Sequence, residues 1–70
     1  MKFWCGNPTA CDACHAPLGH SFVDGWTPRG WGILCDPCHG ALGRGLGIGR
    51  GQRYEKQTDG KWLQTAGGAK

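Results

Sequence analysis

Two Cys-x-x-Cys pairs limit what this chain can fold into more than any other feature. The pairs are Cys11 with Cys14 and Cys35 with Cys38, separated by the 20 residues 15–34 in a chain of 70. Zn²⁺ prefers four donors in a tetrahedron, and a two-residue gap lets each pair form a knuckle that directs both sulfurs at one point. The spacing therefore predicts one structural zinc ion with these four cysteines as its ligands.

The length of the chain explains why a metal ion is expected. A chain of 70 residues buries a small fraction of its surface on folding, and its 14 glycines add backbone entropy that folding must overcome. A structural zinc ion contributes an apparent free energy of about 10–16 kcal/mol at neutral pH in small domains. We therefore expect the metal-free chain to be largely unfolded.

Disulfides and redox chemistry are the first alternative uses of these cysteines. Disulfides are typical of secreted chains, but residues 1–10 contain no apolar stretch of signal-peptide length, and no segment is long and apolar enough to span a membrane. Redox Cys-x-x-Cys motifs accompany a larger sheet than this chain can build. We therefore expect a protein of the reducing cytoplasm.

A histidine follows each pair, which introduces a third alternative. The runs CDACH at 11–15 and CDPCH at 35–39 both match the attachment motif of a c-type haem, with the histidine as axial ligand. Covalent haem attachment normally follows export, for which the chain has no signal. This alternative predicts a Soret band in the purified protein, whereas the zinc site predicts none.

The segment between the two pairs has the pattern of a β-hairpin. Residues 21–23 and 31–34 are rich in β-branched and aromatic side chains. The turn-forming runs Asp24-Gly25 and Pro28-Arg29-Gly30 lie between them. The hairpin is expected to connect the first knuckle to the second.

The second pair is expected to open a short helix. Asp36 is a common capping residue, Pro37 fits the first helical turn, and Gly43 is placed to end the helix. A knuckle, a hairpin and then a helix that carries the last ligands is the order of a treble clef. The sequence thus predicts a small zinc-stabilised α+β fold, treble-clef-like or zinc-ribbon-like, followed by a C-terminal hairpin.

The whole chain, residues 1–70, is expected to form one domain. The C-terminal hairpin is predicted because Asp59-Gly60 is a strong signal for a two-residue turn. The lead-in contains a strand-like piece at residues 2–4. The expected segments are a lead-in, the zinc treble clef, a glycine- and arginine-rich loop, a basic hairpin and a tail, at residues 1–10, 11–43, 44–51, 52–65 and 66–70.

Basic residues are concentrated in the C-terminal part. Residues 1–39 hold two basic and three acidic side chains, whereas residues 40–70 hold six basic and two acidic ones. Basic side chains on a glycine-rich loop can follow a phosphate backbone, and aromatic rings can stack on exposed bases. Candidate contacts to nucleic acid or to a protein partner are therefore Arg44, Arg50, Arg53, Tyr54, Lys56, Lys61 and Trp62. The alternative is a solvated basic surface that keeps a small protein soluble.

Several other residues carry local expectations. One or two of the four tryptophans are expected to cover the zinc cluster, and the others to form an exposed aromatic patch. Cys5 is either a free thiol or a zinc ligand in place of another cysteine. His15 and His39 are expected to bond locally or to face solvent. Asp12 and Asp36 lie inside the pairs and are expected to form a turn and a helix cap.

One run of residues, within about 11–56, has a distinctive order. It contains Phe22-Val23-Asp24-Gly25, then Trp31, Cys35-x-x-Cys38 and finally Gly45-Leu46-Gly47-x-Gly49-x-Gly51-Gln52-x-Tyr54. This run resembles a group of short uncharacterised zinc-binding proteins of tailed bacteriophages and prophages. The resemblance implies a virus-encoded accessory protein that acts in the bacterial cytoplasm, and it implies no particular activity.

A second resemblance implies a reaction. Val23-Asp24, Arg29-Gly30 and the run from Gly32 to Gly43 are similar to the recombination endonuclease VII branch of the His-Asn-His nucleases. Those enzymes fold as a ββα-metal unit on a treble clef; an Asp and an Asn hold Mg²⁺, and a His next to the Asp activates the attacking water. The resemblance implies a second metal ion held by Asp24 and by His39, which stands at the position of the family's asparagine.

The general base of that family is missing from this chain. The position after Asp24, where those nucleases carry the histidine, is Gly25, which has no side chain to accept a proton. His20 lies on the wrong side of Asp24 to replace it. We therefore expect a non-enzymatic, zinc-stabilised binding module whose partner is a host protein or nucleic acid. The alternative is a divalent-metal-dependent DNA endonuclease of the endonuclease VII type.

Overall fold

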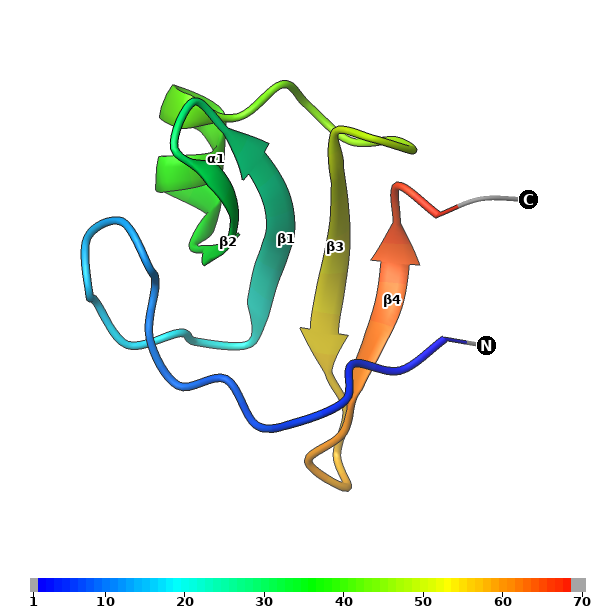
Figure 1. Ribbon diagram of the computed structural model, residues 1–70. Helices are drawn as coiled ribbons and strands as arrows, with labels where there is room; N and C mark the ends of the chain where they lie inside the picture. Colours follow the sequence, from blue (N-terminus) through cyan, green and yellow to red (C-terminus); the bar gives the residue numbers. More distant parts are fainter. Residues whose placement is uncertain (1, 69–70) are drawn as a thin grey trace.

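The computed structural model describes residues 2–68, which form a four-stranded antiparallel sheet with one short helix. The elements in chain order are β1 (Ser21–Thr27), β2 (Gly30–Leu34), α1 (Asp36–Leu42), β3 (Gly51–Lys56) and β4 (Trp62–Ala66). The strands lie in the order β2-β1-β3-β4 (Figure 1). The small α+β fold is confirmed; residue 1 of the expected lead-in and residues 69–70 of the expected tail lie outside the described residues.

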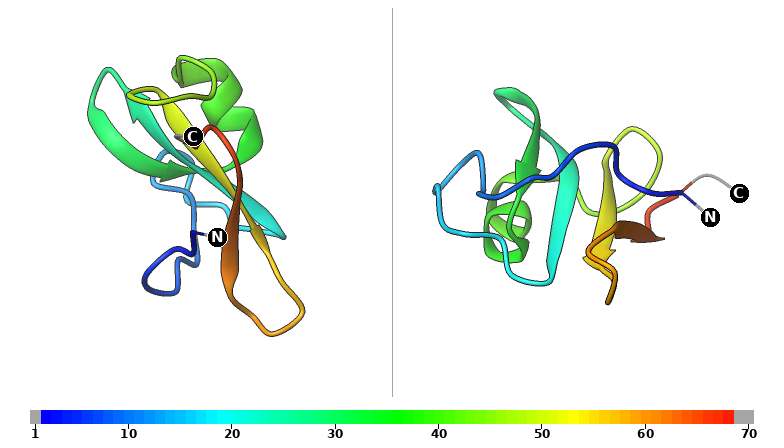
Figure 2. Two further views of the ribbon diagram at one scale, coloured as in Figure 1. Left: turned by 90° about the vertical axis from the view of Figure 1, so that its right-hand side faces the viewer. Right: turned by 90° about the horizontal axis from the view of Figure 1, so that it is seen from below.

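Different parts of the chain cover the two faces of the sheet. Helix α1 packs against β1 and β2 on one face, and the N-terminal segment crosses the other (Figure 2). We call these the helix face and the aromatic face. Because side chains alternate along a strand, Phe22, Asp24 and Trp26 point to the aromatic face, whereas Val23 and Gly25 point to the helix face.

The first expected hairpin forms, with a longer first strand than expected. Strands β1 and β2 pair as far as Thr27 with Gly30, so Pro28 and Arg29 make the turn. The Asp24-Gly25 run lies inside β1 and forms no turn, because strand pairing continues through it on both sides. The Thr27 hydroxyl fastens the turn, since it donates to the Gly30 carbonyl at 2.7 Å and accepts from the Arg29 N–H at 3.1 Å.

The second expected hairpin forms between β3 and β4, but its turn is longer than two residues. The Gln57 N–H donates to the Lys61 carbonyl at 2.7 Å, which leaves three residues, 58–60, as the loop. Gly60 adopts a left-handed conformation with φ 87°, as expected where a type I turn is followed by a bulge. The prediction of a two-residue turn was therefore wrong, because the left-handed Gly60 closes a loop of three residues.

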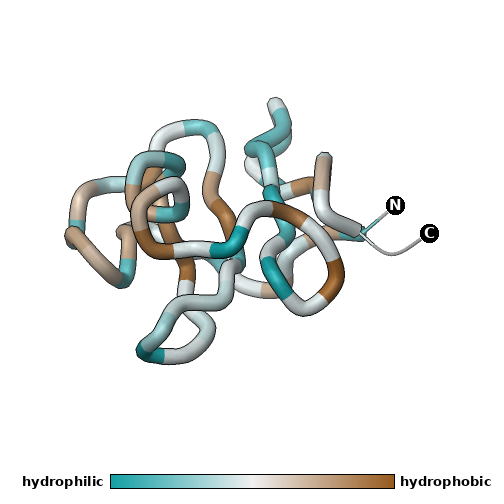
Figure 3. Tube along the Cα trace, turned by 90° about the horizontal axis from the view of Figure 1, so that it is seen from above, coloured by the Kyte–Doolittle hydropathy of each residue, from teal (hydrophilic) through white to brown (hydrophobic). Residues whose placement is uncertain are grey.

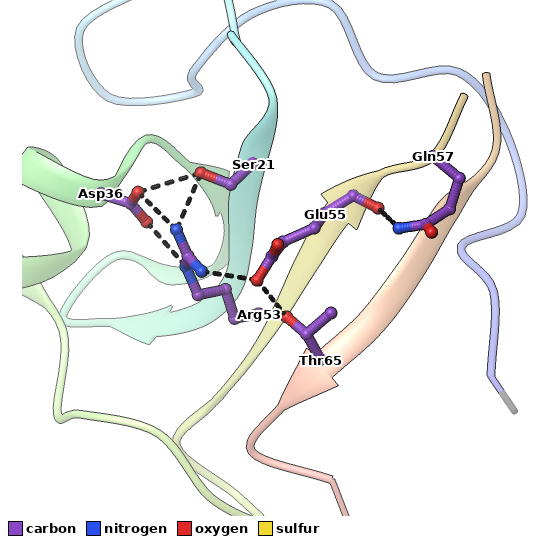
Figure 4. Close-up of polar contacts among 6 residues, drawn as sticks. All are labelled: Ser21, Asp36, Arg53, Glu55, Gln57 and Thr65. Carbon is purple, nitrogen blue, oxygen red and sulfur yellow. Dashed lines mark hydrogen bonds and ion pairs between the residues drawn. The ribbon is translucent and has the colours of Figure 1, made fainter. Parts of the chain in front are cut away.

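Helix α1 begins at the second cysteine pair. The N-cap residue is Cys35 and not Asp36, which is already helical. The Asp36 carboxylate makes no cap, because it accepts a hydrogen bond from the Ser21 hydroxyl at 3.0 Å and pairs with Arg53 at 3.1 Å (Figure 4). Gly43 is the C-cap, as expected.

Four aromatic side chains form the core on the aromatic face. The Phe22 and Tyr54 rings, which are directly opposite each other on β1 and β3, stack with their centroids 5.2 Å apart. Trp4 meets both rings edge-on at 5.3 and 5.4 Å, and Trp62 meets Phe22 edge-on at 5.0 Å. Such contacts add to the free energy of burying aromatic surface. Trp4 and Trp62 therefore build this core and do not cover the cysteines.

The strand-like piece at residues 2–4 lies along the outer edge of β4. The Trp4 N–H donates to the Trp62 carbonyl at 2.9 Å, and the Gln64 N–H donates to the Lys2 carbonyl at 2.8 Å. These bonds satisfy backbone groups that an open edge would leave free for pairing with another chain. Among the described residues, no helix has the length and apolarity that crossing a membrane requires.

Candidate metal centre

The four cysteines of the two pairs come together as a compact group of sulfurs. The Sγ atoms of Cys11, Cys14, Cys35 and Cys38 all lie within 4.8 Å of one another, and those of Cys14 and Cys35 are 3.7 Å apart. A tetrahedral zinc ion with Zn–S bonds of about 2.3 Å needs sulfurs about 3.8 Å apart. The four cysteines are thus positioned to hold one metal ion.

The first knuckle is a tight turn closed by backbone hydrogen bonds. The Cys11 N–H donates to the Ala16 carbonyl at 2.9 Å, and the His15 N–H donates to the Cys11 carbonyl at 2.9 Å. His15 completes the turn in a left-handed conformation with φ 65°. The N–H groups of Ala13 and Cys14 lie 3.4 and 3.5 Å from the Cys11 Sγ, so that they stabilise negative charge on that sulfur.

The second knuckle is the junction between β2 and α1. Cys35 caps the helix and Cys38 lies in its first turn, so the two sulfurs project from the same end of α1. The His39 N–H donates to the Cys35 carbonyl at 2.9 Å, the first hydrogen bond of the helix. Helix formation at this junction therefore positions half of the sulfurs.

Asp12 joins the two knuckles. Its N–H donates to the Ile33 carbonyl at 2.7 Å, and its carboxylate Oδ2 accepts from the Ile33 N–H at 2.8 Å. Asp12 thereby supplies both the donor and the acceptor that a neighbouring strand would offer to the edge of β2. Ile33 is two residues before Cys35, so these bonds fix the distance between the pairs. Sequence reasoning expected only a turn former here.

The electrostatics of the sulfur group favour a cation. Burial opposes ionisation of Cys11, but backbone N–H groups, from Cys14 above all, lower the pKa of this thiol to about 6. Hydrogen bonds to the Cys35 and Cys14 sulfurs raise the pKa of Cys38 to about 12. Once one sulfur is ionised, its neighbours resist ionisation because like charges would lie side by side. A divalent cation removes that repulsion.

Cys5 and the two histidines next to the pairs take no part in the sulfur group. Cys5 is exposed and is not among the four clustered sulfurs, so it does not replace another ligand. The His15 side chain is exposed, as expected of a residue that faces solvent. The Nε2 atom of His39 lies 3.0 Å from the Gly45 carbonyl, which is a local hydrogen bond.

The structure does not bring Asp24 and His39 together as ligands of a second metal ion. Asp24 points to the aromatic face of β1, where burial raises its pKa and Lys2 partly offsets that effect. His39 lies on the helix face, because a Cβ built at Gly25 would be 3.1 Å from its Cδ2 atom. The sheet therefore separates the two side chains.

Glycines make room for the imidazole of His39 on the helix face. Built Cβ atoms at Gly25, Gly43 and Gly51 would lie 3.1, 2.5 and 3.2 Å from the nearest atoms of this ring. Gly25 and Gly51 are paired across β1 and β3, so the ring rests on bare backbone. In the sequence, Gly25 was interpreted as the position where a catalytic histidine is missing. In the structure, Gly25 makes room for the ring of His39.

Three of the seven expected partner contacts are built into the fold. Tyr54 and Trp62 belong to the aromatic core with 2% and 3% exposure, so neither ring is free to stack on a base. Arg53 pairs with Asp36 at 3.1 Å and with Glu55 at 2.9 Å (Figure 4). These three assignments are corrected, because the aromatic rings face inward and the guanidinium is already neutralised.

The two expected lysines lie over aromatic rings near the β3–β4 turn. The Lys56 Nζ is 5.7 Å from the ring centroid of Trp62, and the Lys61 Nζ is 5.9 Å from that of Phe3. Both lysines are exposed. They are thus accessible, at the end of the sheet where β3 ends and β4 begins.

Three arginines belong to segments at the opposite end of the sheet, the end that faces the viewer in Figure 3. Arg29 lies in the β1–β2 turn, and Arg44 and Arg50 lie in the loop from α1 to β3. That loop crosses the end of β1, because the Trp26 N–H donates to the Arg50 carbonyl at 2.9 Å. We call the three arginines the arginine end. None of them forms an ion pair within residues 2–68.

No family model, curated protein or solved structure matches this chain. The resemblances to short phage proteins and to endonuclease VII therefore stay predictions from the residues that carry them. Sequence reasoning missed Asp12 and Arg29 as residues of interest. An Asp inside a Cys-x-x-Cys pair and an Arg in a Pro-Arg-Gly turn were the available signals.

Proposed function

We propose that this protein is a zinc-stabilised, non-catalytic module that binds nucleic acid. The arginine end carries the proposal, because three guanidinium groups lie at one end of the sheet without carboxylate partners in the described chain. Arg53, in contrast, shows how this fold neutralises an arginine that it uses structurally. Unpaired arginines at one end are suited to contact phosphates.

The distribution of acidic residues supports the same partner. The sequence has no Asp or Glu between Asp24 and Asp36, and none between Asp36 and Glu55. The segments that form the arginine end therefore contain no acidic residue of their own, and the carboxylate that lines a cavity with Arg29 is Asp12 of the first knuckle. The loop between α1 and β3 also presents bare backbone at Gly45 and Gly49, which are left-handed at φ 81° and 76° and where an added Cβ would meet nothing within 4 Å. A phosphate chain can approach such a backbone closely.

The metal in this proposal is zinc in a structural role. Four thiolates are the donor set typical of closed zinc sites, which leave no coordination position for a substrate. One ion in a chain this short supports folding directly. The ion's function is thus to hold the two knuckles and α1 against the sheet, so that the arginine end has a fixed shape.

The nuclease alternative gains no supporting observation. Asp24 and His39 lie on opposite faces of the sheet, and a side chain at Gly25 would press against the His39 ring. A phosphodiesterase needs both a metal to stabilise the leaving oxygen and a base to activate water. We therefore propose a binding role without hydrolysis. The resemblance to phage proteins suggests an accessory protein in the host cytoplasm, where a host protein is the competing partner.

Binding to labelled oligonucleotides over a series of salt concentrations tests the proposal. The zinc-loaded protein should bind at low salt, and the logarithm of its affinity should fall linearly with the logarithm of salt concentration. The triple variant R29Q/R44Q/R50Q should bind more weakly and with a shallower slope. The control K56Q/K61Q removes two accessible charges at the opposite end of the sheet and should have the smaller effect for each charge removed.

Two results would contradict the nucleic-acid proposal. One is the absence of binding at low salt by protein that contains its metal. The other is capture of a host protein that is insensitive to both salt and nuclease treatment, which would make that protein the partner.

A further inference from the structure

Two tryptophans lie directly opposite each other at the arginine end. Trp26 on β1 pairs with Trp31 on β2, and directly opposite residues of an antiparallel pair present their side chains on the same face. Trp31 is 51% exposed, which is unusual for so large an apolar ring, while Trp26 is half-buried. A single exposed apolar residue needs no explanation, but an exposed ring beside arginines is the combination that binds single-stranded nucleic acid.

Arginine and tryptophan are interleaved at this end. The Arg44 guanidinium carbon lies 4.5 Å from the ring centroid of Trp26, so the cation covers one ring of the pair. Arg29 and Trp31 are two residues apart around the turn, and both line a cavity of about 430 Å³. One arginine therefore lies beside the exposed indole and another lies over the indole paired with it.

The cavity beside Trp31 has the size of a small-ligand pocket. Pockets of this kind span about 300–1,000 Å³ and are mostly apolar with a few polar groups. Here Leu34 and Leu42 supply apolar walls, and Arg29 and Asp12 supply the charged groups. The Asp12 carboxylate accepts from the Ile33 N–H and keeps its negative charge, so Arg29 is the cation that a phosphate would meet in this cavity. A flat ring next to a phosphate fits this combination.

Other aromatic residues do not offer such a surface. Tyr54 and Trp62 are buried in the core, and Trp4 packs edge-on against it. Phe3 is 45% exposed but lies beside Lys61 at a distance of 5.9 Å, away from the arginine end. Among the described residues, Trp31 is thus the exposed ring that accompanies unpaired arginines.

We propose that the arginine end binds single-stranded nucleic acid, with Trp31 stacked on an unpaired base and Arg29, Arg44 and Arg50 on the flanking phosphates. This proposal rests on the proposed nucleic-acid function and specifies the form of nucleic acid. A duplex hides the faces of its bases, so an exposed indole gains contact only with an unpaired base. Stacking tolerates any base, because every base has a π-face.

The test compares one oligonucleotide as a single strand and as a duplex. The zinc-loaded protein should bind the single strand more tightly at equal salt, and binding should quench tryptophan fluorescence. Trp31→Ala should weaken single-strand binding by about 5- to 150-fold, the equivalent of one lost stacking contact. Trp31→Phe should retain most of the affinity, because a stacking ring remains. Phe3→Ala, which truncates an exposed aromatic ring (45% exposed) away from the arginine end, is the matched control and should bind normally.

The outcomes separate this inference from the proposed function. Equal affinity for the duplex, with no loss in Trp31→Ala, would overturn the stacking inference and leave phosphate binding intact. A loss of affinity in Trp31→Phe as large as in Trp31→Ala would also overturn it, since stacking requires only an aromatic ring. The failure of every oligonucleotide to bind would overturn both proposals. Zinc content and the circular dichroism spectrum of each variant show whether it is folded.

Discussion

Asp12 occupies the place of a strand partner for Ile33 at the edge of β2. Its N–H and its carboxylate bond the carbonyl and the N–H of the same residue, at 2.7 and 2.8 Å. Because Asp12 follows Cys11 directly and Ile33 precedes Cys35 by two positions, the two bonds fix one cysteine pair relative to the other. The metal centre therefore depends on a residue that contributes no ligand atom.

Removing the Asp12 carboxylate should weaken metal binding without removing a ligand. Substitutions of groups that orient metal ligands typically cost about 10–100-fold in affinity, and we expect about tenfold for Asp12→Ala because this site is exposed. Asp12→Asn keeps an acceptor oxygen and should fall between Asp12→Ala and the wild type. Competition with a chromophoric chelator measures the affinities. Three indistinguishable affinities would mean that Asp12 does not position the site.

A methyl group at Gly25 should destabilise the protein by way of His39. The added Cβ would lie 3.1 Å from the ring and 3.4 Å from Leu34 Cδ1, and overpacking of this kind costs about 1–3 kcal/mol. Gly25→Ala should cost less when His39→Ala is already present, because the contacting ring is gone. Gly40→Ala is the control, since a Cβ there meets nothing within 4 Å. Urea unfolding of the wild type, the two single variants and the double variant gives the coupling free energy between Gly25 and His39. Additive costs of the two substitutions would contradict the packing role of Gly25.

Arg53 should contribute a modest free energy that does not change with pH near neutrality. Its guanidinium bonds Asp36, Glu55 and Ser21. Because the Arg53 side chain is 33% exposed and the two carboxylates are more exposed, Arg53→Met should lower the free energy of unfolding by about 1–2 kcal/mol. Bonding to Arg53 lowers the pKa of Asp36, so this contribution is complete above the unfolded pKa and is lost as pH falls through the folded one.

The pH profile checks the assignment of the Arg53 network. Plots of unfolding free energy against pH for the wild type and Arg53→Met should run parallel from about pH 8 to about pH 5. Curves that converge above about pH 5 would show that a group other than the Asp36 carboxylate is coupled to Arg53.

Asp24→Asn should leave the protein at least as stable as the wild type at pH 7. Burial raises the pKa of Asp24, so its ionised form destabilises the fold above the unfolded pKa. The neutral amide removes that penalty, and the advantage should shrink as pH falls below the raised pKa of Asp24 and vanish below its unfolded pKa. Thermal unfolding at several pH values measures the effect. Loss of a divalent-metal-dependent DNA-nicking activity in Asp24→Asn would instead favour the nuclease alternative.

The fold was predictable where local chemistry determines it. The two knuckles followed from the spacing of cysteines, because a tetrahedral ion leaves few ways to arrange two Cys-x-x-Cys pairs. The first hairpin followed from runs of β-branched and aromatic residues around turn signals, and the second followed from the Asp59-Gly60 turn signal. The extension of β1 through Asp24 was missed because strand pairing with β3 overrides a local Asp-Gly signal. The extra turn residue at 58–60 was missed because the Asp-Gly signal marks a turn without fixing its length.

The partner surface was less predictable, because burial depends on contacts far apart in the sequence. Tyr54 and Trp62 are close to basic residues in the sequence, but their rings meet Phe22 on β1 in the core. Arg53 is likewise neutralised by Asp36, 17 positions earlier. Arg29 and Trp31 belong to residues 1–39, which carry almost no net charge. Only the fold brings them to the same end of the sheet as Arg44 and Arg50.

X-ray absorption at the zinc edge, on protein purified without added metal, tests the central claim most directly. The account predicts one zinc ion per chain surrounded by four sulfur atoms at about 2.3 Å, with no nitrogen or oxygen neighbour in the first coordination sphere. Cys35→Ser should lose the ion and the fold with it. A first coordination sphere that contains nitrogen or oxygen, or a folded protein that contains no metal, would contradict the account.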